Sequence, residues 1–251
     1  MNAVNLMIKQ SSFNSRESSM AEVNGLLLPR LGIALQPIVS ADNHSHVHAY
    51  EALLRINSGH WEMSPEALIC AAEIDGSITA LDRWVLRESI SLANRIKGPM
   101  IWTNVSQISM ADRSFVTDAI MMLTYTQMHN RISLEITETA DGDLIEIESN
   151  IKSLHLNGVS VVIDDLWEGF SKTELLEVSG VTACKLSKTA KDDMKSDLAV
   201  LKKGQALVKE CRRKGQMVVL EGVETQEDID LAGELGVTHL QGFLIGLAEQ
   251  I

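Results

Sequence analysis

Short apolar runs alternate with amphipathic helical segments along most of this chain, and this alternation limits the available folds more than any other feature of the sequence. The runs have the length of buried strands. The segments between them repeat apolar side chains at near-helical spacing, as Leu81, Trp84 and Val85 do within residues 78–95. Strands that alternate with helices are typical of α/β proteins with a parallel sheet. The chain is therefore expected to build repeated strand–helix units.

The number of predicted units is that of a closed barrel. We expect strands at residues 33–39, 47–56, 101–105, 132–137, 160–163, 183–186, 217–220 and 239–243. We expect helices at residues 67–73, 78–95, 115–128, 144–156, 172–178, 198–213 and 226–235. An open doubly wound sheet would have fewer units and a glycine-rich first turn. The expected fold class is α/β, a (β/α)8 TIM-like barrel with a functional site at the carboxyl ends of its strands.

The first two strands depart from this scheme. Only a short polar turn at residues 41–44 separates them, so they are expected to pair as an antiparallel first hairpin. Such a start is unusual for a barrel of parallel strands. The chain stops at Ile251, so the helix that usually closes the barrel is expected to be short or missing.

Length and composition fit one large domain. The chain has 251 residues, of which 45% are hydrophobic and 22% are charged. Residues 1–24 are expected to form a flexible N-terminal tail, because most of them are polar and many are Ser, and residues 25–251 are expected to form the barrel. No apolar run has the length of a transmembrane helix, and the N-terminus lacks the pattern of a signal peptide. We expect a cytoplasmic protein without membrane contact and without a preceding sensory domain.

The balance of charge restricts the partners. The net charge of −12 argues against direct binding of nucleic acid, because phosphate backbones are bound by neutralising them. An anionic ligand would need a local cation, such as a metal ion, Arg55 or Lys185. The three cysteines have no metal-binding spacing and are expected to be buried reduced thiols: Cys70, Cys184 and Cys211.

Polar residues stand at the carboxyl ends of the predicted strands. Glu51, Leu53 and Arg55 share one face of their strand, because successive side chains of a strand point to opposite faces. The other strand ends carry polar residues in the same way: Asn104, Glu135, Asp164, Asp165, Lys185, Glu221 and Gln241. Buried polar groups without a ligand or a partner are costly. A cluster of them at the mouth of a barrel therefore indicates a functional site.

The predicted cluster has the chemistry of a metal site. Five carboxylates and the amide oxygen of Asn104 would meet there, and carboxylates at close range cannot all stay ionised without a cation. Oxygen ligands suit Mg²⁺ or Mn²⁺ rather than zinc, and so many anionic ligands suit two ions. Two ions stabilise the attacking and leaving oxygens of a phosphodiester displacement. Lys185 could orient or deprotonate the attacking water, and Arg55 could pair with a phosphate oxygen.

Each of these residues has a simpler explanation when it is taken alone. An acidic residue at a strand end is most often a helix cap or a solvated loop residue. Asn104 alone could be a turn residue, and Lys185 alone a surface lysine. Glu138 and Glu224 are expected to be structural or to support the cluster from behind. The histidines in and near the first hairpin are not expected to bind metal: His44, His46, His48 and His60.

Seven short motifs occur in order along the chain. They are Glu51-Ala52-Leu53-Leu54-Arg55, Asn104-Val105-Ser106, Glu135-Ile136-Thr137-Glu138, Asp164-Asp165, Lys185, Glu221-Gly222-Val223-Glu224 and Gln241-Gly242-Phe243. In order and spacing they resemble the EAL domain family, over residues 31–248. The resemblance implies a TIM-like barrel with an irregular start. It also implies metal-dependent hydrolysis of one phosphodiester of cyclic di-GMP, which gives the linear dinucleotide pGpG.

The resemblance assigns roles to single residues. It implies these metal ligands: Glu51, Asn104, Glu135 and Asp164, with Asp165 and Glu221 for the second ion. It implies these catalytic residues: Lys185, which matches the family's catalytic lysine, Gln241, which lies near the attacking water, Asp165 and Glu221. Gln36 and Arg55 match positions that touch the ligand, and Glu138 matches a position that helps to hold a mobile loop. A homodimer, formed through the loop after residues 160–163, is also implied.

Three positions depart from the family pattern. Trp167 replaces a glycine in the loop after Asp165, where a residue other than glycine costs about 1 kcal/mol or more if the backbone needs positive φ. Ser187 replaces the aspartate expected two residues after the catalytic lysine, and Ala248 replaces a proline. Every implied metal ligand is present. Loss of support around such ligands commonly lowers activity by about 10- to 100-fold.

Three functions follow from this pattern. The leading hypothesis is a cyclic di-GMP phosphodiesterase that uses Mg²⁺ or Mn²⁺ and is weakened by Trp167 and Ser187. The alternative is a module that binds cyclic di-GMP with little or no turnover and acts through a regulatory protein partner. In the third, the ligand site is vestigial and the acidic surface binds a protein, for example a transcription regulator. The presence of all the ligands argues against the third.

Overall fold

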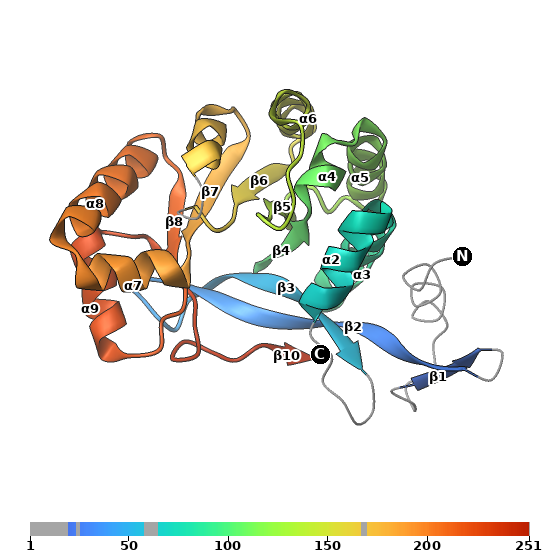
Figure 1. The fold of residues 1–251 in the computed structure, drawn as a ribbon, viewed down its shortest axis with the longest axis horizontal. Coiled ribbons are helices and arrows are strands. Elements are labelled where there is room, and N and C mark those ends of the chain that lie inside the picture. The colour runs from blue at the N-terminus through green and yellow to red at the C-terminus, as the bar shows by residue number, and fades with distance from the viewer. Residues whose placement is uncertain (1–19, 24–25, 58–64, 167–169, 251) are drawn as a thin grey trace.

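Strands β2 to β9 close into one barrel in the computed structural model, which describes residues 20–23, 26–57, 65–166 and 170–250. The described helices lie along the outside of its parallel strands, and β2 and β10 run along the side away from most of them (Figure 1). The described strands are β1 (Met20–Val23), β2 (Leu26–Ser40), β3 (Val47–Asn57), β4 (Met100–Val105), β5 (Ile132–Ile136), β6 (Ser160–Ile163), β7 (Val181–Leu186), β8 (Met217–Leu220), β9 (His239–Leu240) and β10 (Glu249–Gln250). The described helices are α2 (Pro65–Asp75), α3 (Ile78–Arg95), α4 (Gln107–Ala111), α5 (Arg113–Thr126), α6 (Leu144–Leu156), the 3₁₀ helix η1 (Phe170–Glu177), α7 (Lys188–Ser196), α8 (Leu198–Arg213) and α9 (Gln226–Leu235).

The barrel closes through β2. This strand pairs antiparallel with β3, where Gln36 lies opposite Glu51, and antiparallel with β9, where Val39 lies opposite Leu240. From β3 to β9, each strand runs parallel to the next. The predicted fold class, a (β/α)8 TIM-like barrel with an antiparallel first hairpin, is confirmed.

The two ends of the chain differ in part from the prediction. β2 begins at Leu26, earlier than expected, and its first part pairs with β1. β1 lies within residues 1–24, the expected tail, but residues 1–19 are outside the described part, so the tail and the domain boundary stay predictions. After β9, residues 241–250 contain no described helix, and β10 pairs with β2, in agreement with a short or missing closing helix.

Two described helices were not predicted, and one predicted helix is of another type. Residues 172–178 were expected to be helical, and the structure has the 3₁₀ helix η1 at this place. The unpredicted helices are α4, which has only five residues, and α7. α7 buries Ala190, Lys191 and Met194. Because one of these is a lysine, only Ala190 and Met194 mark the buried face in the sequence, and two apolar positions are too few to predict a helix.

The core has two layers, because successive side chains of each strand point to opposite faces. The inner layer lies within the barrel and consists of Ile38, Ala49, Trp102, Val162, Ala183 and Val219. The larger outer layer lies between the strands and the helices, and includes Val161, Ile163 and Cys184. Val162, Ala183 and Val219 thus fill the interior, two residues before Asp164, Lys185 and Glu221.

Two histidines pack against each other beside the inner layer. His239 lies opposite Val219 in the β8–β9 ladder, and its ring centroid is 4.5 Å from that of His48. Burial and the nearby histidines His48 and His46 lower the pKa of His239 to about 4. Burial, followed by the charge of His46, also lowers the pKa of His48. Both rings are therefore neutral near pH 7.

The cysteines only partly follow the prediction. All three are free thiols; Cys184 and Cys211 are buried, with their Sγ atoms 3.8 Å apart between β7 and α8. Cys70 is exposed on α2, so the expectation that it is buried was wrong. Its helix presents this position to solvent and buries only Ala72 in the core.

Candidate active site

The strand ends bring the predicted site residues together at one mouth of the barrel. In the ladders that form this mouth, Gln36 lies opposite Glu51, and Asn104 lies opposite Glu135. Lys185 occupies the same face of β7 as Ala183 of the inner layer, two residues earlier. Period-two alternation in strands of matched register therefore directs these side chains to one place above the inner layer.

Lys185 is the centre of this cluster. Its Nζ lies 2.6 Å from Glu135 Oε1 and 2.6 Å from Glu221 Oε1. The same atom lies 3.2 Å from Glu51 Oε2 and 3.2 Å from Asp164 Oδ1. The Lys185 side chain is 1% exposed and that of Glu135 is 0% exposed. One buried ammonium thus contacts four carboxylates from four different strand ends.

Neutral side chains fix one of these carboxylates. Glu51 Oε1 accepts a hydrogen bond of 2.8 Å from Asn104 Nδ2, and Glu51 Oε2 accepts one of 2.6 Å from Gln241 Nε2. Gln241 Nε2 also donates to Gln36 Oε1 at 3.3 Å, and Gln36 Nε2 donates to the carbonyl oxygen of Gly246 at 3.1 Å. The amides of three strands therefore orient Glu51 toward Lys185.

The mutual charges of the cluster shift its pKa values in opposite directions. Burial alone would lower the pKa of Lys185, but the surrounding carboxylates, led by Asp164 and Glu135, raise it well above its usual range. Burial alone would raise the pKa of Glu51, but the Lys185 charge and the hydrogen bonds from Asn104 and Gln241 lower it. Lys185 is therefore an ammonium and Glu51 a carboxylate near pH 7.

The other carboxylates are incompletely balanced. Burial raises the pKa of Glu135 well above its usual range, and repulsion from Glu51 and Asp164 adds to this, against the attraction of Lys185. Burial raises the pKa of Glu221 to about 8 against the opposing charge of Lys185, with repulsion from Asp164 and Glu51. One ammonium does not offset four carboxylates, so the cluster favours additional positive charge.

The residues present fit a hard divalent cation. Asp164, Asp165 and Glu221 each offer a carboxylate oxygen, and these oxygens lie within 4.8 Å of one another. Glu135 Oε2 is buried and accepts no hydrogen bond from any residue that the structure describes. Carboxylate oxygens are the ligands that Mg²⁺ and Mn²⁺ prefer, and zinc sites are instead rich in His and Cys. Asp165 has a positive φ of 48°, a left-handed backbone conformation that differs from the extended backbone of β6.

A cleft of about 280 Å³ opens beside the cluster. Asn104, Asp164 and Asp165 line one side of it, and Arg55 lines it as well. The Arg55 guanidinium donates a hydrogen bond of 2.9 Å to the carbonyl oxygen of Leu54. The cleft therefore joins a cation and the carboxylate cluster, and it is the place where an anionic ligand could meet both.

The two glutamates predicted to have supporting roles follow the ends of β5 and β8. Glu138 is half-buried in the bend after β5. Glu224 is exposed and accepts a hydrogen bond of 2.8 Å from Lys188 Nζ. Of the histidines, His48 packs against His239, which precedes Gln241 by two residues, and His60 lies outside the described residues.

Of the two main departures from the family pattern, Ser187 and Trp167, the structure describes the first. Ser187 is the N-cap of α7, and its hydroxyl accepts a hydrogen bond of 3.1 Å from the backbone N–H of Ala190. Its side chain therefore stabilises the start of a helix and brings no charge to the mouth. Trp167 lies outside the described residues.

Sequence reasoning missed Asp82, which lines the same cleft. This carboxylate is buried on α3 and accepts a hydrogen bond of 3.0 Å from the backbone N–H of Ser106. Burial raises its pKa to about 7, although hydrogen bonds from Ser109 and Ser106 oppose the shift. The available signal was its position: it directly follows Leu81 and lies three residues before Val85, within the buried stripe of its helix.

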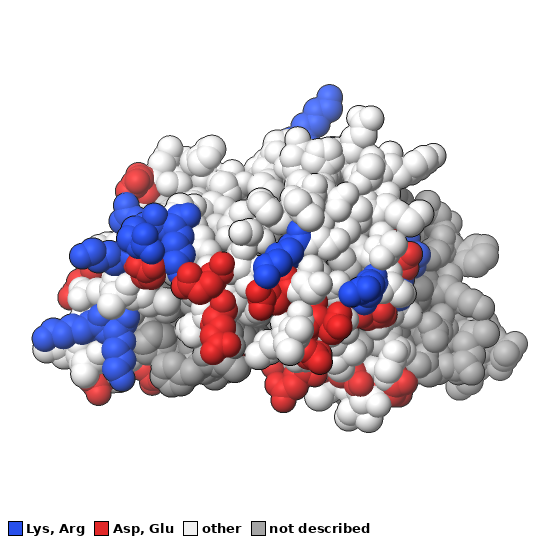
Figure 2. Space-filling model, turned by 90° about the horizontal axis from the view of Figure 1, so that it is seen from above, with Lys and Arg blue, Asp and Glu red and all other residues white. Residues whose placement is uncertain are grey.

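Charged side chains on the surface are mixed in sign. Figure 2 shows acidic side chains spread over the middle of one face and basic side chains gathered at one side of it. The helix α8 has these exposed basic residues: Lys202, Lys203, Lys209, Arg212 and Arg213. No helix that the structure describes has the length and hydropathy needed to cross a membrane.

Comparison with curated proteins gives relatives that are longer than this chain. It is 30% identical to the cyclic di-GMP phosphodiesterase PA2567 of Pseudomonas aeruginosa over 201 residues, which cover 75% of this chain and 34% of that protein. It is 31% identical to an uncharacterized signaling protein of Caulobacter vibrioides, with 88% of this chain and 28% of that protein covered. The chain thus spans about a quarter to a third of these relatives.

Comparison with solved structures gives the same architecture. A structure described as PaMucR phosphodiesterase in complex with c-di-GMP has a TM-score of 0.77 and 27% identity, and covers 88% of this chain and 92% of that one. An EAL domain protein from Listeria monocytogenes EGD-e has a TM-score of 0.80 and 19% identity, with 100% and 94% covered, and shares the fold. Residues 23–248 match the family described as EAL domain, and the chain therefore belongs to the EAL domain family.

Proposed function

We propose that this protein is a metal-dependent cyclic di-GMP phosphodiesterase that opens one phosphodiester bond and releases linear pGpG. The observation that carries the proposal is the contact of the buried Lys185 ammonium with four carboxylates beside a cleft that Arg55 lines. Two relatives described by name as cyclic di-GMP phosphodiesterases, PA2567 and NbdA of Pseudomonas aeruginosa, support it at 30% and 28% identity. A complex of PaMucR phosphodiesterase with c-di-GMP supports the choice of ligand.

Mg²⁺ or Mn²⁺ is the proposed cofactor, in a two-ion site. Its proposed ligands are Glu51, Asn104, Glu135, Asp164, Asp165 and Glu221. When bound, such ions would stabilise the attacking and leaving oxygens of the phosphodiester displacement. The raised pKa values of Glu135 and Glu221 support this proposal, because added positive charge keeps both carboxylates ionised at neutral pH.

The side chains around the cluster have distinct proposed tasks. Lys185 Nζ orients the attacking water as a hydrogen-bond donor and stabilises the negative charge that develops on it, since the ammonium is held among the carboxylates where that water would lie. Its raised pKa argues against a role as proton acceptor. Gln241, which donates to Glu51, orients the same water. Arg55 pairs with a phosphate oxygen of the substrate across the cleft, and Gln36 contacts the ligand from β2. Glu138 and Glu224 support the loops after β5 and β8.

The test is a turnover assay on the purified protein. Cyclic di-GMP is incubated in parallel with Mn²⁺, Mg²⁺ and Ca²⁺, and the nucleotides are separated by chromatography. The expected result is pGpG with Mn²⁺ or Mg²⁺, and none with Glu51→Gln, which keeps the shape of the side chain but not its charge. Substrate that stays intact for hours at high concentrations of the wild-type protein and Mn²⁺ would refute the proposal.

One observation favours a second candidate, a module that binds cyclic di-GMP with little turnover and signals through a protein partner. Ser187 caps α7 and offers no carboxylate at a position where the family pattern has aspartate. Calorimetry separates the two candidates, since tight binding without turnover supports the module. The homodimer and the cytoplasmic location stay predictions, and light scattering tests the former.

A further inference from the structure

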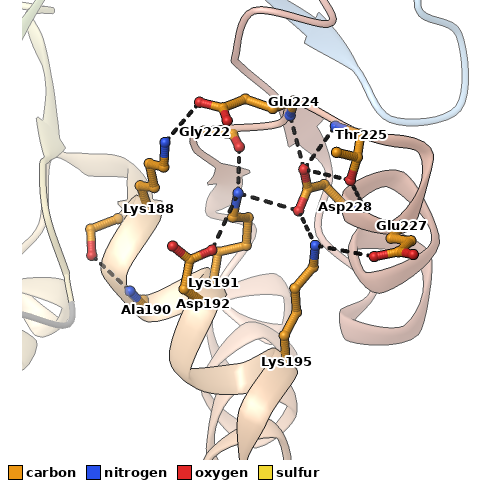
Figure 3. Close-up of polar contacts among 11 residues, drawn as sticks. Lys188, Ala190, Lys191, Asp192, Lys195, Gly222, Glu224, Thr225, Glu227 and Asp228 are labelled. Atoms are coloured by element: carbon orange, nitrogen blue, oxygen red, sulfur yellow. Dashed lines mark hydrogen bonds and ion pairs between the residues drawn. The ribbon is translucent and has the colours of Figure 1, made fainter.

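A buried lysine of α7 lies directly behind the loop that carries Glu221 (Figure 3). The Lys191 side chain is 4% exposed. Its Nζ lies 2.5 Å from the carbonyl oxygen of Gly222 and 3.2 Å from Asp228 Oδ1. It also lies 3.5 Å from Asp192 Oδ1, on the more exposed side. Lys191 thus joins α7 to both the start of the loop after β8 and the first turn of α9.

The loop turns sharply at the residue that Lys191 contacts. The backbone N–H of Glu221 donates to the carbonyl oxygen of Leu186, and that of Val223 donates to the carbonyl oxygen of Gln241. Between them, Gly222 has a φ of +61°, and a Cβ atom there would meet Lys188 side-chain atoms at 2.9–3.1 Å. α7 therefore lies against this peptide, and a larger residue at position 222 would have to displace the Lys188 side chain and adopt a positive φ.

Asp228 does not depend on Lys191 for its partners. Its carboxylate accepts hydrogen bonds of 2.9 Å from the backbone N–H groups of Glu224 and Thr225, and one of 3.0 Å from the Thr225 hydroxyl. Lys195 Nζ lies 2.6 Å from Asp228 Oδ1. These contacts form a capping box at the start of α9, with Lys195 as the second cation (Figure 3). The contact that Lys191 alone adds is the one to Gly222.

A charged group at this depth is not explained by stability. Removal of an ammonium from water is costly, and well-packed apolar side chains often replace buried ion pairs without loss of stability. Met194, on the same buried face of α7, shows that this helix packs with an unbranched apolar side chain. What an apolar residue cannot do is donate a hydrogen bond to the peptide that follows Glu221.

We propose that Lys191 is a positioning residue that fixes the peptide of Gly222 and thereby holds the Glu221 carboxylate toward Lys185. It touches neither substrate nor reacting atoms. Its expected effect on the affinity for divalent cations rests on the proposed function, in which Glu221 is a metal ligand. Its importance for the order of the loop does not, because it follows from the contacts with Gly222 and Asp228 alone.

Lys195 gives a matched control. Lys191→Met and Lys195→Met each remove one ammonium from the same carboxylate, but only the first removes the donor to Gly222. Hydrogen exchange of the amides of residues 221–224 is measured by mass spectrometry without added metal. We expect exchange about tenfold faster in Lys191→Met and within about twofold of wild type in Lys195→Met, because the loop opens locally when its anchor is lost.

Manganese affinity supplies the second measurement. We expect Lys191→Met to bind Mn²⁺ about 10- to 100-fold more weakly in calorimetry, as is usual when support of a metal ligand is lost. Lys195→Met is expected to stay within about threefold of wild type. Lys191→Arg, which keeps a donor for the carbonyl of Gly222, should recover most of the affinity and the slow exchange.

Equal exchange in the two methionine variants would overturn the positioning role. A wild-type protein that binds no Mn²⁺ would instead contradict the proposed function, and the exchange comparison would still decide the role of Lys191. If Lys191→Met does not fold, the same comparison is made in the Asp228→Asn background. There, loss of either lysine no longer leaves the Asp228 carboxylate with one cation fewer. Equal exchange of the two double variants would likewise overturn the role.

Discussion

The mouth of the barrel and the interior just below it are built on the same faces of the same strands, yet their chemistry is opposite. Lys185 stands two residues after Ala183 on β7, and Glu135 two residues after Ser133 on β5. The same step separates Glu51 from Ala49, Asn104 from Trp102, Asp164 from Val162, Glu221 from Val219 and Gln241 from His239. A step of two residues, about 6.7 Å, thus separates an ionised cluster from a packed core.

The comparison shows how the lower layer supports the upper one. Mostly apolar side chains, of which Trp102 is the largest, fill the interior, and close packing of this kind keeps the register of the strands fixed. Above it, four carboxylates face one ammonium, an arrangement that would not persist on flexible elements. Mutations in the upper layer should therefore affect chemistry, and mutations in the lower layer should affect stability.

The largest effect is expected for Lys185→Met. Loss of the ammonium removes the group proposed to orient the attacking water and to stabilise its developing charge, so turnover with Mn²⁺ should fall by about 10²- to 10³-fold. Affinity for cyclic di-GMP should change far less, because Arg55 and the cleft remain. Rates of pGpG formation and calorimetry measure the two quantities. Lys188→Met, which removes an exposed lysine paired with Glu224, is the control, and equal rates for the two variants would contradict the prediction.

Trp102→Ala tests the lower layer. This side chain is 1% exposed within the barrel, and its truncation should lower the free energy of unfolding by about 3–5 kcal/mol. Molecules that remain folded should keep a turnover rate within tenfold of wild type, since no cluster residue is removed. Urea denaturation at low temperature measures the first effect, and rates corrected for the folded fraction measure the second. A loss of turnover as large as that of Lys185→Met would show that the layers are not separable.

Glu135→Gln exchanges a buried carboxylate for an amide of the same shape. Because burial and two neighbouring carboxylates raise the pKa of Glu135, the metal-free variant should be at least as stable as wild type. Mn²⁺ at 100 times its dissociation constant should stabilise the wild type by about 2.7 kcal/mol, and the variant by less. Thermal melting with and without Mn²⁺ measures this.

The control for this exchange lies two residues earlier on the same face. Ser133→Ala removes a hydrogen bond to Ser160 of 2.6 Å and should cost about 1 kcal/mol. It should leave the increase in stability caused by Mn²⁺ unchanged. An equal loss of that increase in both variants would place the cation away from Glu135.

The sequence allowed most of this arrangement to be predicted, because two rules are local and strict. Alternation along a strand places Glu51 and Arg55 on one face, and barrel strands end at one mouth, so the convergence of the polar residues followed without coordinates. What did not follow was which of them Lys185 contacts. Four distances from one nitrogen depend on register and rotamers across strands far apart in the chain.

Two of the missed features have one cause, which is that a buried charged residue looks like a surface residue in a sequence. The helix α7 was not predicted because a lysine, Lys191, stands on its buried face. Asp82 was missed because an aspartate on α3 is expected to face solvent. Ser187 was interpreted as the loss of a carboxylate, although a serine directly before a helical segment is also an N-cap signal. Cys70 was assumed buried because its neighbours are apolar, whereas its helix contacts the core through Ala72.

The smallest effect is expected at His239, which lies beside Val219 of the inner layer. Its folded pKa is lowered to about 4, whereas the unfolded chain binds a proton near pH 6.5, so the unfolded state takes up more protons between these values. Stability from this group is therefore complete above pH 6.5 and decreases as the pH falls toward 4. His239 is half-buried, so solvent reduces the loss to on the order of 1 kcal/mol.

Urea denaturation at pH 7.5 and 5 should show a smaller decrease in His239→Gln than in wild type, whereas a variant of the exposed His44 should behave as wild type. Equal decreases in all three would mean that the histidine pair is not what titrates. Turnover of His239→Gln at pH 7.5 should equal that of wild type, because a neutral ring two residues below Gln241 carries no charge to the mouth.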